Sequence, residues 1–201
     1  MRVFTQRSAH SFLIMLAILL LAMPALAGFE KQLSFSAGSL EVRNLIGEIT
    51  VKGHGGSTFD VRVSVQGRDA GEDLIRIESN DGARAELLVV FPNEDNFVYP
   101  KLGHGSRTTI NRNRDSGWLE SLLGIGDGGR ITIRDSGRGL EVWADITIMV
   151  PSGSALEVKH GVGQISVRDV DAEIALASRS GSIEGSGISG SLLADTGSGH
   201  V

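Results

Sequence analysis

Residues 154–201 repeat a pattern of apolar residues and glycines with a step of 18 residues. Within each repeat, apolar residues stand two positions apart, which is typical of a strand that buries one face. Five columns keep this step: Leu156, Ile174 and Leu192; Val158, Leu176 and Ala194; Gly163, Gly181 and Gly199; Ile165, Ile183 and Val201; and Val170 and Ile188. One unit is too short to enclose a core, so the units must stack, each strand pairing in parallel with its copy. The pattern therefore predicts an all-β chain built around a β-solenoid with 18-residue rungs.

The same pattern occurs once more near the start of the chain. Two sets of residues share its spacing: Leu40, Val42, Gly47, Ile49 and Val51, and Leu156, Val158, Gly163, Ile165 and Val167. The displacement between them is 116 residues, which is not a multiple of 18. A region without the repeat therefore lies between two pieces of the solenoid.

The region between the two copies has the pattern of longer strands. Alternating valines predict a strand over residues 60–66, and residues 74–78 and 87–91 flank Asn80-Asp81-Gly82, a sequence typical of a β-hairpin. Further strands are expected at 131–133, 140–143 and 146–150. We expect these strands to pair mainly antiparallel and to be fused edge-on to the solenoid. Residues 99–129, rich in Gly, Ser and Asn, predict an irregular insert with one or two helical turns around Trp118.

The first 27 residues have the layout of a secretory signal peptide. Arg2 and Arg7 precede an apolar stretch at about 12–23, and Ala25-Leu26-Ala27 supplies the small-residue cleavage pattern. Cleavage after Ala27 would leave residues 28–201 as a single exported domain without a transmembrane span, in the periplasm or at the cell surface. An uncleaved N-terminal anchor is the alternative.

Composition narrows the range of functions. The chain has no cysteine, which excludes disulfides, a thiolate nucleophile and cysteine-ligated metals. Its net charge of -5 argues against a nucleic-acid partner, which would normally meet a basic face.

The sequence offers no catalytic, cofactor or metal motif. His54 and His104 stand in Gly-His-Gly contexts, but without the i, i+4 spacing or acidic neighbours of a metal site, so we interpret the histidines as surface turn residues. Residues 124–129 match G-x-G-x-x-G without the preceding strand and following helix that dinucleotide binding needs. A polysaccharide-cleaving β-helix would stack carboxylates in adjacent rungs, yet Glu157 is followed in its column by Ala175 and Leu193. We therefore expect no enzyme activity and no cofactor.

The insert holds the candidate contact residues. Lys101, Arg107, Arg112 and Arg114 form a basic group that would suit an anionic polymer or a membrane surface, or belong to a solvated loop. Trp118, with nearby leucines, would either cover an open solenoid edge or contact a partner or bilayer.

Several runs resemble the bacterial putative-adhesin family of Gly-rich β-solenoid domains, which are largely of unknown function. They are Ile146–Gly153, Leu156–Val158, Gly163–Val167, Ser180–Gly185 and Thr196–Gly199. The resemblance covers roughly residues 30–66 and 140–201, and the insert at 99–129 departs from it. It implies a right-handed single-stranded β-helix in an envelope or surface setting, and it supplies no catalytic residues.

Together these features predict an exported, non-enzymatic envelope protein, adhesin-like or a scaffold, whose partner is an envelope glycan or protein. The alternatives are a polysaccharide-active β-helix with its site in the middle region, and an accessory or sensor partner of an envelope-stress system. Because the third repeat stops at Val201, we also expect either further rungs or self-association through an open solenoid edge.

Overall fold

The computed structural model describes residues 28–111, Leu122 and residues 129–201. The predicted signal peptide, Arg112, Arg114 and Trp118 lie outside these residues. Within them the fold is all-β, with two six-stranded sheets and a smaller four-stranded sheet. In this described part no helix is long and apolar enough to cross a membrane.

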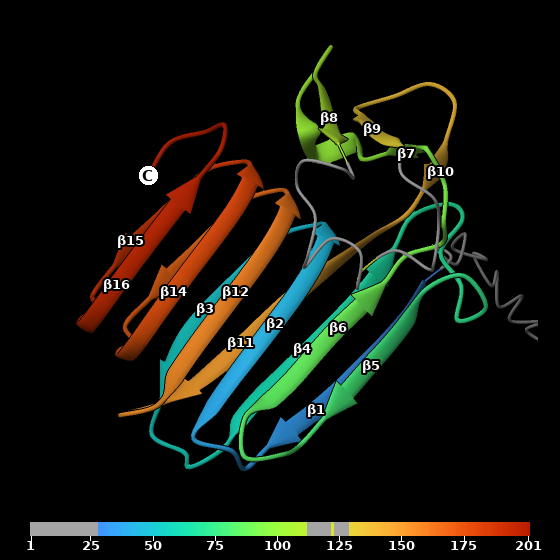
Figure 1. Cartoon of the computed structure of the whole chain (residues 1–201). Coiled ribbons are helices and arrows are strands. Elements are labelled where there is room, and N and C mark those ends of the chain that lie inside the picture. The colour runs from blue at the N-terminus through green and yellow to red at the C-terminus, as the bar shows by residue number, and fades with distance from the viewer. Residues whose placement is uncertain (1–27, 112–121, 123–128) are drawn as a thin grey trace, which may run out of the picture.

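The two large sheets form two layers, and the small sheet lies at one end of them (Figure 1). Sheet I has the order β16 (Ser189–Thr196), β14 (Asp171–Ser180), β12 (Ala155–Val162), β2 (Ser39–Ile46), β6 (Ala85–Val90), β5 (Arg76–Asn80). Sheet II has the order β1 (Gly28–Phe35), β4 (Phe59–Gln66), β11 (Trp143–Pro151), β3 (Ile49–His54), β13 (Ile165–Arg168), β15 (Ile183–Ser186). The small sheet has the order β10 (Leu140–Glu141), β7 (Asn96–Val98), β9 (Arg130–Arg134), β8 (Arg107–Asn111), and a 3-10 turn, η1 (Pro100–Leu102), follows β7.

The strands predicted from the repeat pair in parallel and in the predicted register. Leu156 of β12 lies opposite Ile174 of β14, 18 residues later, and opposite Leu40 of β2, 116 residues earlier. Ile165 of β13 likewise pairs with Ile183 and with Ile49. Both copies of the pattern therefore belong to one continuous stack. Val201 does not extend this ladder, because it lies outside any strand and is 74% exposed.

The strands of the middle region pair both in parallel and antiparallel, which corrects the expectation that their pairing is mainly antiparallel. β5 and β6 form the predicted antiparallel hairpin, and β4 pairs antiparallel with β1 and β11. However, β6 pairs in parallel with β2, and β11 pairs in parallel with β3. Each repeat unit places one strand in sheet I and the next in sheet II, and we call such a pair of strands a coil. β6 and β11 lie beside the strands of the first coil, β2 and β3, and run in the same direction as these strands.

The insert is also more regular than predicted. Its described part contains η1 and β8, and β8 pairs antiparallel with β9. Tyr99, Ile110 and Leu122 are buried, so the insert shares the core of the molecule. The Gly- and Ser-rich composition concealed a short strand because β-propensity depends strongly on neighbouring strands.

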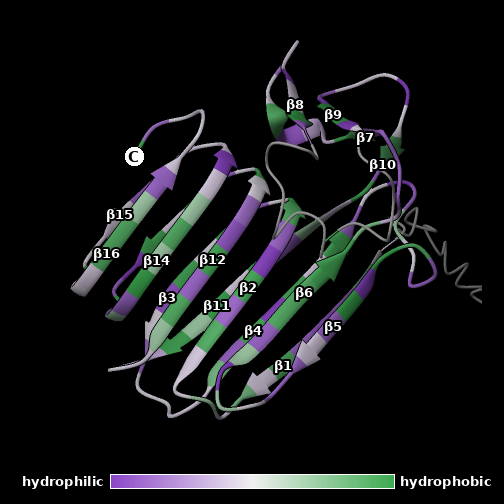
Figure 2. Cartoon of the chain, viewed as in Figure 1, coloured by the Kyte–Doolittle hydropathy of each residue, from purple (hydrophilic) through white to green (hydrophobic). Residues whose placement is uncertain are grey.

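The core lies between the two large sheets. Figure 2 shows hydrophobic and hydrophilic residues alternating along their strands, as expected when one face of each sheet is buried. Val61, Val63 and Val65 of β4 are buried, as are Leu156 and Val158 of β12. The alternation seen in the sequence thus corresponds to the inner and outer faces of the sheets.

Glycines form the corners where the chain passes from sheet I to sheet II. Gly47 and Gly163 have φ values of 140° and 135°, a region that residues with a Cβ rarely adopt. A Cβ at Gly163 would collide with the carbonyl oxygen of Gly47 in the neighbouring coil. The corner glycines therefore permit both the turn and the close stacking of successive coils.

Candidate functional site

A polar groove with a volume of about 710 Å³ lies between the corners of the stacked strands and the small-sheet region. One wall is the corner column, which we define as Glu48, Gln164, Ser182 and His200. Each of these residues directly follows a glycine of the corner series. The column therefore exists because the repeat places one polar residue per coil at the same corner.

Backbone hydrogen bonds hold the corner column in register. The amide of Ile49 donates to the carbonyl oxygen of Gln164 at 2.9 Å, and that of Ile165 donates to Ser182 at 2.9 Å. The amide of Ile183 donates to His200 at 2.8 Å. Adjacent members of the column therefore follow the strand spacing of ~4.8 Å.

The second wall comes from the residues after β7. Tyr99, Lys101, Leu102 and Ser106 line it. The hydroxyl oxygens of Thr108 in β8 and Ser180 in β14 are 3.2 Å apart, a hydrogen bond that ties this wall to sheet I. The insert thus forms one side of the groove.

Lys101 is a predicted contact residue that lies in the groove, where its charge is already compensated. Its Nζ atom lies 3.1 Å from Oε2 of Glu48 and 2.9 Å from Oδ2 of Asp145. Burial alone would lower the pKa of Lys101, but the hydrogen bonds and charges of Asp145 and Glu48 outweigh it and raise the pKa. Desolvation, followed by the charges of Asp145 and Glu48, raises the pKa of Tyr99, so its phenol stays neutral. Lys101 therefore closes an ion-pair network instead of offering a free charge to an anionic polymer.

The structure does not gather the predicted basic group into one described site. Arg107 is exposed at the start of β8, opposite Arg134 of β9, and Arg107 does not line the groove. Arg112, Arg114 and Trp118 are outside the described residues.

The histidines occupy different environments, and the prediction that they are surface turn residues is wrong for His160. His104 is fully exposed, and Nε2 of His54 lies 2.8 Å from the carbonyl oxygen of Thr58. His160, in contrast, is completely buried in β12. Over the described residues, no group of three or more His, Cys, Asp or Glu side chains is arranged to hold a metal ion.

A second polar feature lies on the outer side of sheet I. We call it the charged face and define it by the charged residues Glu41, Arg43, Glu86, Glu157 and Lys159. Glu86, Glu41 and Glu157 are direct neighbours on adjacent parallel strands, so one column does stack acids, contrary to the prediction. Glu41 is 4% exposed and contacts Arg43 at 2.6 Å and Lys159 at 2.8 Å. Burial would raise the pKa of Glu41, but the hydrogen bonds and charges of Arg43 and Lys159 lower it to about 2. Glu41 is therefore unsuited to donating a proton.

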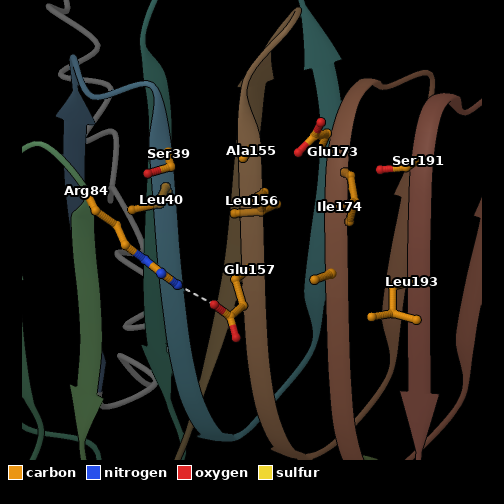
Figure 3. A pocket seen from close by; sticks show the side chains of 11 residues that line it. Ser39, Leu40, Arg84, Ala155, Leu156, Glu157, Glu173, Ile174, Ser191 and Leu193 are labelled. Carbon is orange, nitrogen blue, oxygen red and sulfur yellow. Dashed lines mark hydrogen bonds and ion pairs between the residues drawn. The ribbon is translucent and has the colours of Figure 1, made fainter.

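Beside the charged face lies a smaller depression of about 330 Å³ (Figure 3). Arg84 spans its margin and pairs with Glu157 and with Glu41. Small or apolar side chains, such as Ala155, Ala175 and Leu193, form much of the lining. The depression therefore combines an ion pair at its margin with a largely small and apolar lining.

The charged face and the corner groove could each be predicted in part from the sequence. The 116-residue displacement places Glu157 beside Glu41, but applying only the 18-residue step misses that pair. The members of the corner column can be read from the sequence, since each one directly follows a glycine of the corner series. The opposite wall has no sequence signal, because it depends on how the insert packs.

The comparisons with known proteins are sparse. No protein-family model matches the chain, and no curated protein matches it. Among solved structures, a match is the crystal structure of a putative cell adhesion protein from Clostridium sporogenes, with 9% sequence identity and a TM-score of 0.36. The match covers 78% of this chain and 60% of that one.

Proposed function

We propose that the protein is an exported, non-enzymatic β-solenoid of the bacterial envelope that binds a partner, in an adhesin-like or scaffolding role, through the corner groove. The groove itself carries the proposal. It combines hydroxyl, amide and imidazole groups in a regular column, and the Lys101 ammonium at its end is already paired with Glu48 and Asp145. Such a lining suits recognition of a polar ligand better than acid–base chemistry, which needs a group free to give or take a proton.

The solenoid interpretation rests on the parallel register. Strands β2, β12, β14 and β16 repeat on one sheet, and β3, β13 and β15 repeat on the other. A stack of this kind supports a linear array of equivalent side chains, which is a common basis for extended binding surfaces in repeat proteins.

Fractionation and envelope binding test this proposal. We expect a tagged full-length chain to be recovered outside the cytoplasm, and the purified protein to sediment with envelope fragments. Ser182→Trp, which fills the groove, should abolish sedimentation, whereas Ser57→Trp in an exposed turn should not. Cytoplasmic retention, or equal sedimentation of both variants, would contradict the proposal.

One observation favours polysaccharide cleavage as a second candidate. Glu48 and Asp145 contact the same Lys101 ammonium at the end of the groove, so two carboxylates lie close together there. Glycosidases use paired carboxylates of this kind, one as a general acid. A reducing-end assay on envelope glycans, with Glu48→Gln as the inactive control, would reveal such an activity.

A further inference from the structure

We infer that the corner groove binds a single uncharged, β-linked polysaccharide chain that runs along the stacking direction, with Gln164, Ser182 and His200 contacting successive sugar units. This inference rests on the proposed binding function and specifies its ligand.

The repeat distance of the corner column supports an extended polymer. Neighbouring members belong to hydrogen-bonded coils, so they recur at ~4.8 Å, which is close to the advance of one sugar in an extended β-linked chain. A ligand without a regular repeat would use one position of the column and leave the others unused. The column therefore favours a polymer with one polar unit per coil.

The charge of the groove favours an uncharged ligand. Lys101 lies between Glu48 and Asp145, within 3.1 Å of each, and no basic residue other than Lys101 and His200 lines the groove in the described part of the chain. A polyanion would compete with two carboxylates for one ammonium. A polycation would compete with Lys101 for these carboxylates.

The hydrogen-bonding groups match sugar hydroxyls. The side chains of Gln164, Ser182 and Ser198 each offer a donor and an acceptor, and a sugar hydroxyl also both donates and accepts. Sugar units along the column would therefore find a complementary partner on each coil.

An extended peptide fits this wall less well. Peptides that add to a sheet bind through free backbone groups. At the corners those groups are already used, because the amides of Gly47, Gly163 and Gly181 donate to Val162, Ser180 and Ser198 of the next coil. The amides of these corner glycines are therefore not available to pair with a peptide backbone.

Calorimetric titration of the purified protein tests the inference. The probes are cellohexaose and chitohexaose as uncharged β-linked chains, with heparin and polygalacturonate as polyanions. We expect the uncharged hexamers to bind, their dimers to bind much more weakly because they span fewer coils, and the polyanions not to bind. Polyanion binding, or equal affinity for dimer and hexamer, would overturn the inference.

Two matched double variants locate the binding site. Gln164→Ala/Ser182→Ala removes groups from the corner column and should weaken hexamer binding by about tenfold or more, since each lost hydrogen bond contributes to affinity. Ser166→Ala/Ser186→Ala changes the same two coils outside the groove and should leave affinity unchanged. Both variants should keep the melting temperature of the wild type. Equal affinities would overturn the inference.

The two proposals fail differently. If the protein sediments with envelope fragments but binds neither hexamer, the ligand assignment is wrong and the binding function stands. If it binds no envelope fraction, the proposed function itself is wrong.

Discussion

The Nε2 atom of His160 lies 2.9 Å from the carbonyl oxygen of Gly47, a residue 113 positions earlier in the chain. Its Nδ1 atom faces the carbonyl oxygen of Asn44 at 3.3 Å. Burial lowers the pKa of His160 to about 4, although these carbonyls and Asp145 act in the opposite direction. The imidazole therefore ties the corner of one coil to the next in its neutral form.

This contact predicts that stability falls as the solution becomes acidic. In the unfolded chain His160 has an ordinary pKa near 6.5, so between pH 6.5 and pH 4 the unfolded state binds the proton more readily. The free energy of unfolding should drop by about 2 kcal/mol between pH 7 and pH 5 from this group alone. Urea titrations at both values would measure the drop. His160→Asn cannot titrate, so it should lose that part of the pH dependence, and an unchanged slope would contradict the assignment.

The corner glycines predict a large difference between two similar substitutions. Gly163→Ala should destabilise the protein by several kcal/mol, because φ is 135° and the added methyl meets the backbone of Gly47. Gly38→Ala is the control, since a Cβ there meets nothing within 4 Å. Thermal unfolding should show a clear loss for the first variant and little change for the second.

The register predicts a further contrast between adjacent positions in the third coil. Ile183 is 3% exposed and pairs with Ile165, so Ile183→Asp buries an unpaired carboxylate at a cost of several kcal/mol. Ser182 is partly exposed at the corner, and Ser182→Asp should change stability by about 0.5 kcal/mol or less. Equal melting temperatures would show that the residues do not occupy these faces.

Much of the fold follows from the sequence because parallel stacking repeats the same contacts. The columns of Leu156 and Ile165 fix both the strands and their register, since a slip of one residue would expose the apolar side chains. The direction of β6 and β11 was not predictable in this way. These strands contain alternating apolar residues, a pattern that fits parallel and antiparallel pairing equally.

The candidate site was less predictable than the fold. Lys101 was identified from its charge, but the charge is neutralised by Glu48 and Asp145, which are distant in sequence. His160 was interpreted, like the other histidines, as a surface turn residue, yet it continues the alternation of Leu156 and Val158 on the inner face of β12 and is buried. For Lys101 the deciding contacts join segments that no local pattern connects, whereas the burial of His160 follows from the alternation within its own strand.

The charged face predicts a coupled loss of stability. Glu41→Gln leaves Arg43 and Lys159 without their shared carboxylate, and the lowered pKa of Glu41 corresponds to about 3 kcal/mol of stabilisation at neutral pH. This contribution is present above pH 4.5 and is lost as the pH falls toward 2. A double-mutant cycle with Lys159→Met, followed by urea unfolding at pH 7, should show a coupling energy clearly above zero. Additive losses would mean that the two side chains act independently.

The edge of sheet I predicts self-association. Within the described residues β16 pairs with β14 alone, so its other side presents unpaired backbone groups, and Leu193 is 71% exposed beside them. An exposed, apolar edge strand is a template for pairing with a second chain, and a lysine on such a strand opposes it. We expect the protein to sediment faster as its concentration rises, and Leu193→Lys to remove this dependence. Ser57→Lys adds the same charge in an exposed turn and should preserve it. A wild-type protein that stays monomeric across the concentration range would contradict this prediction.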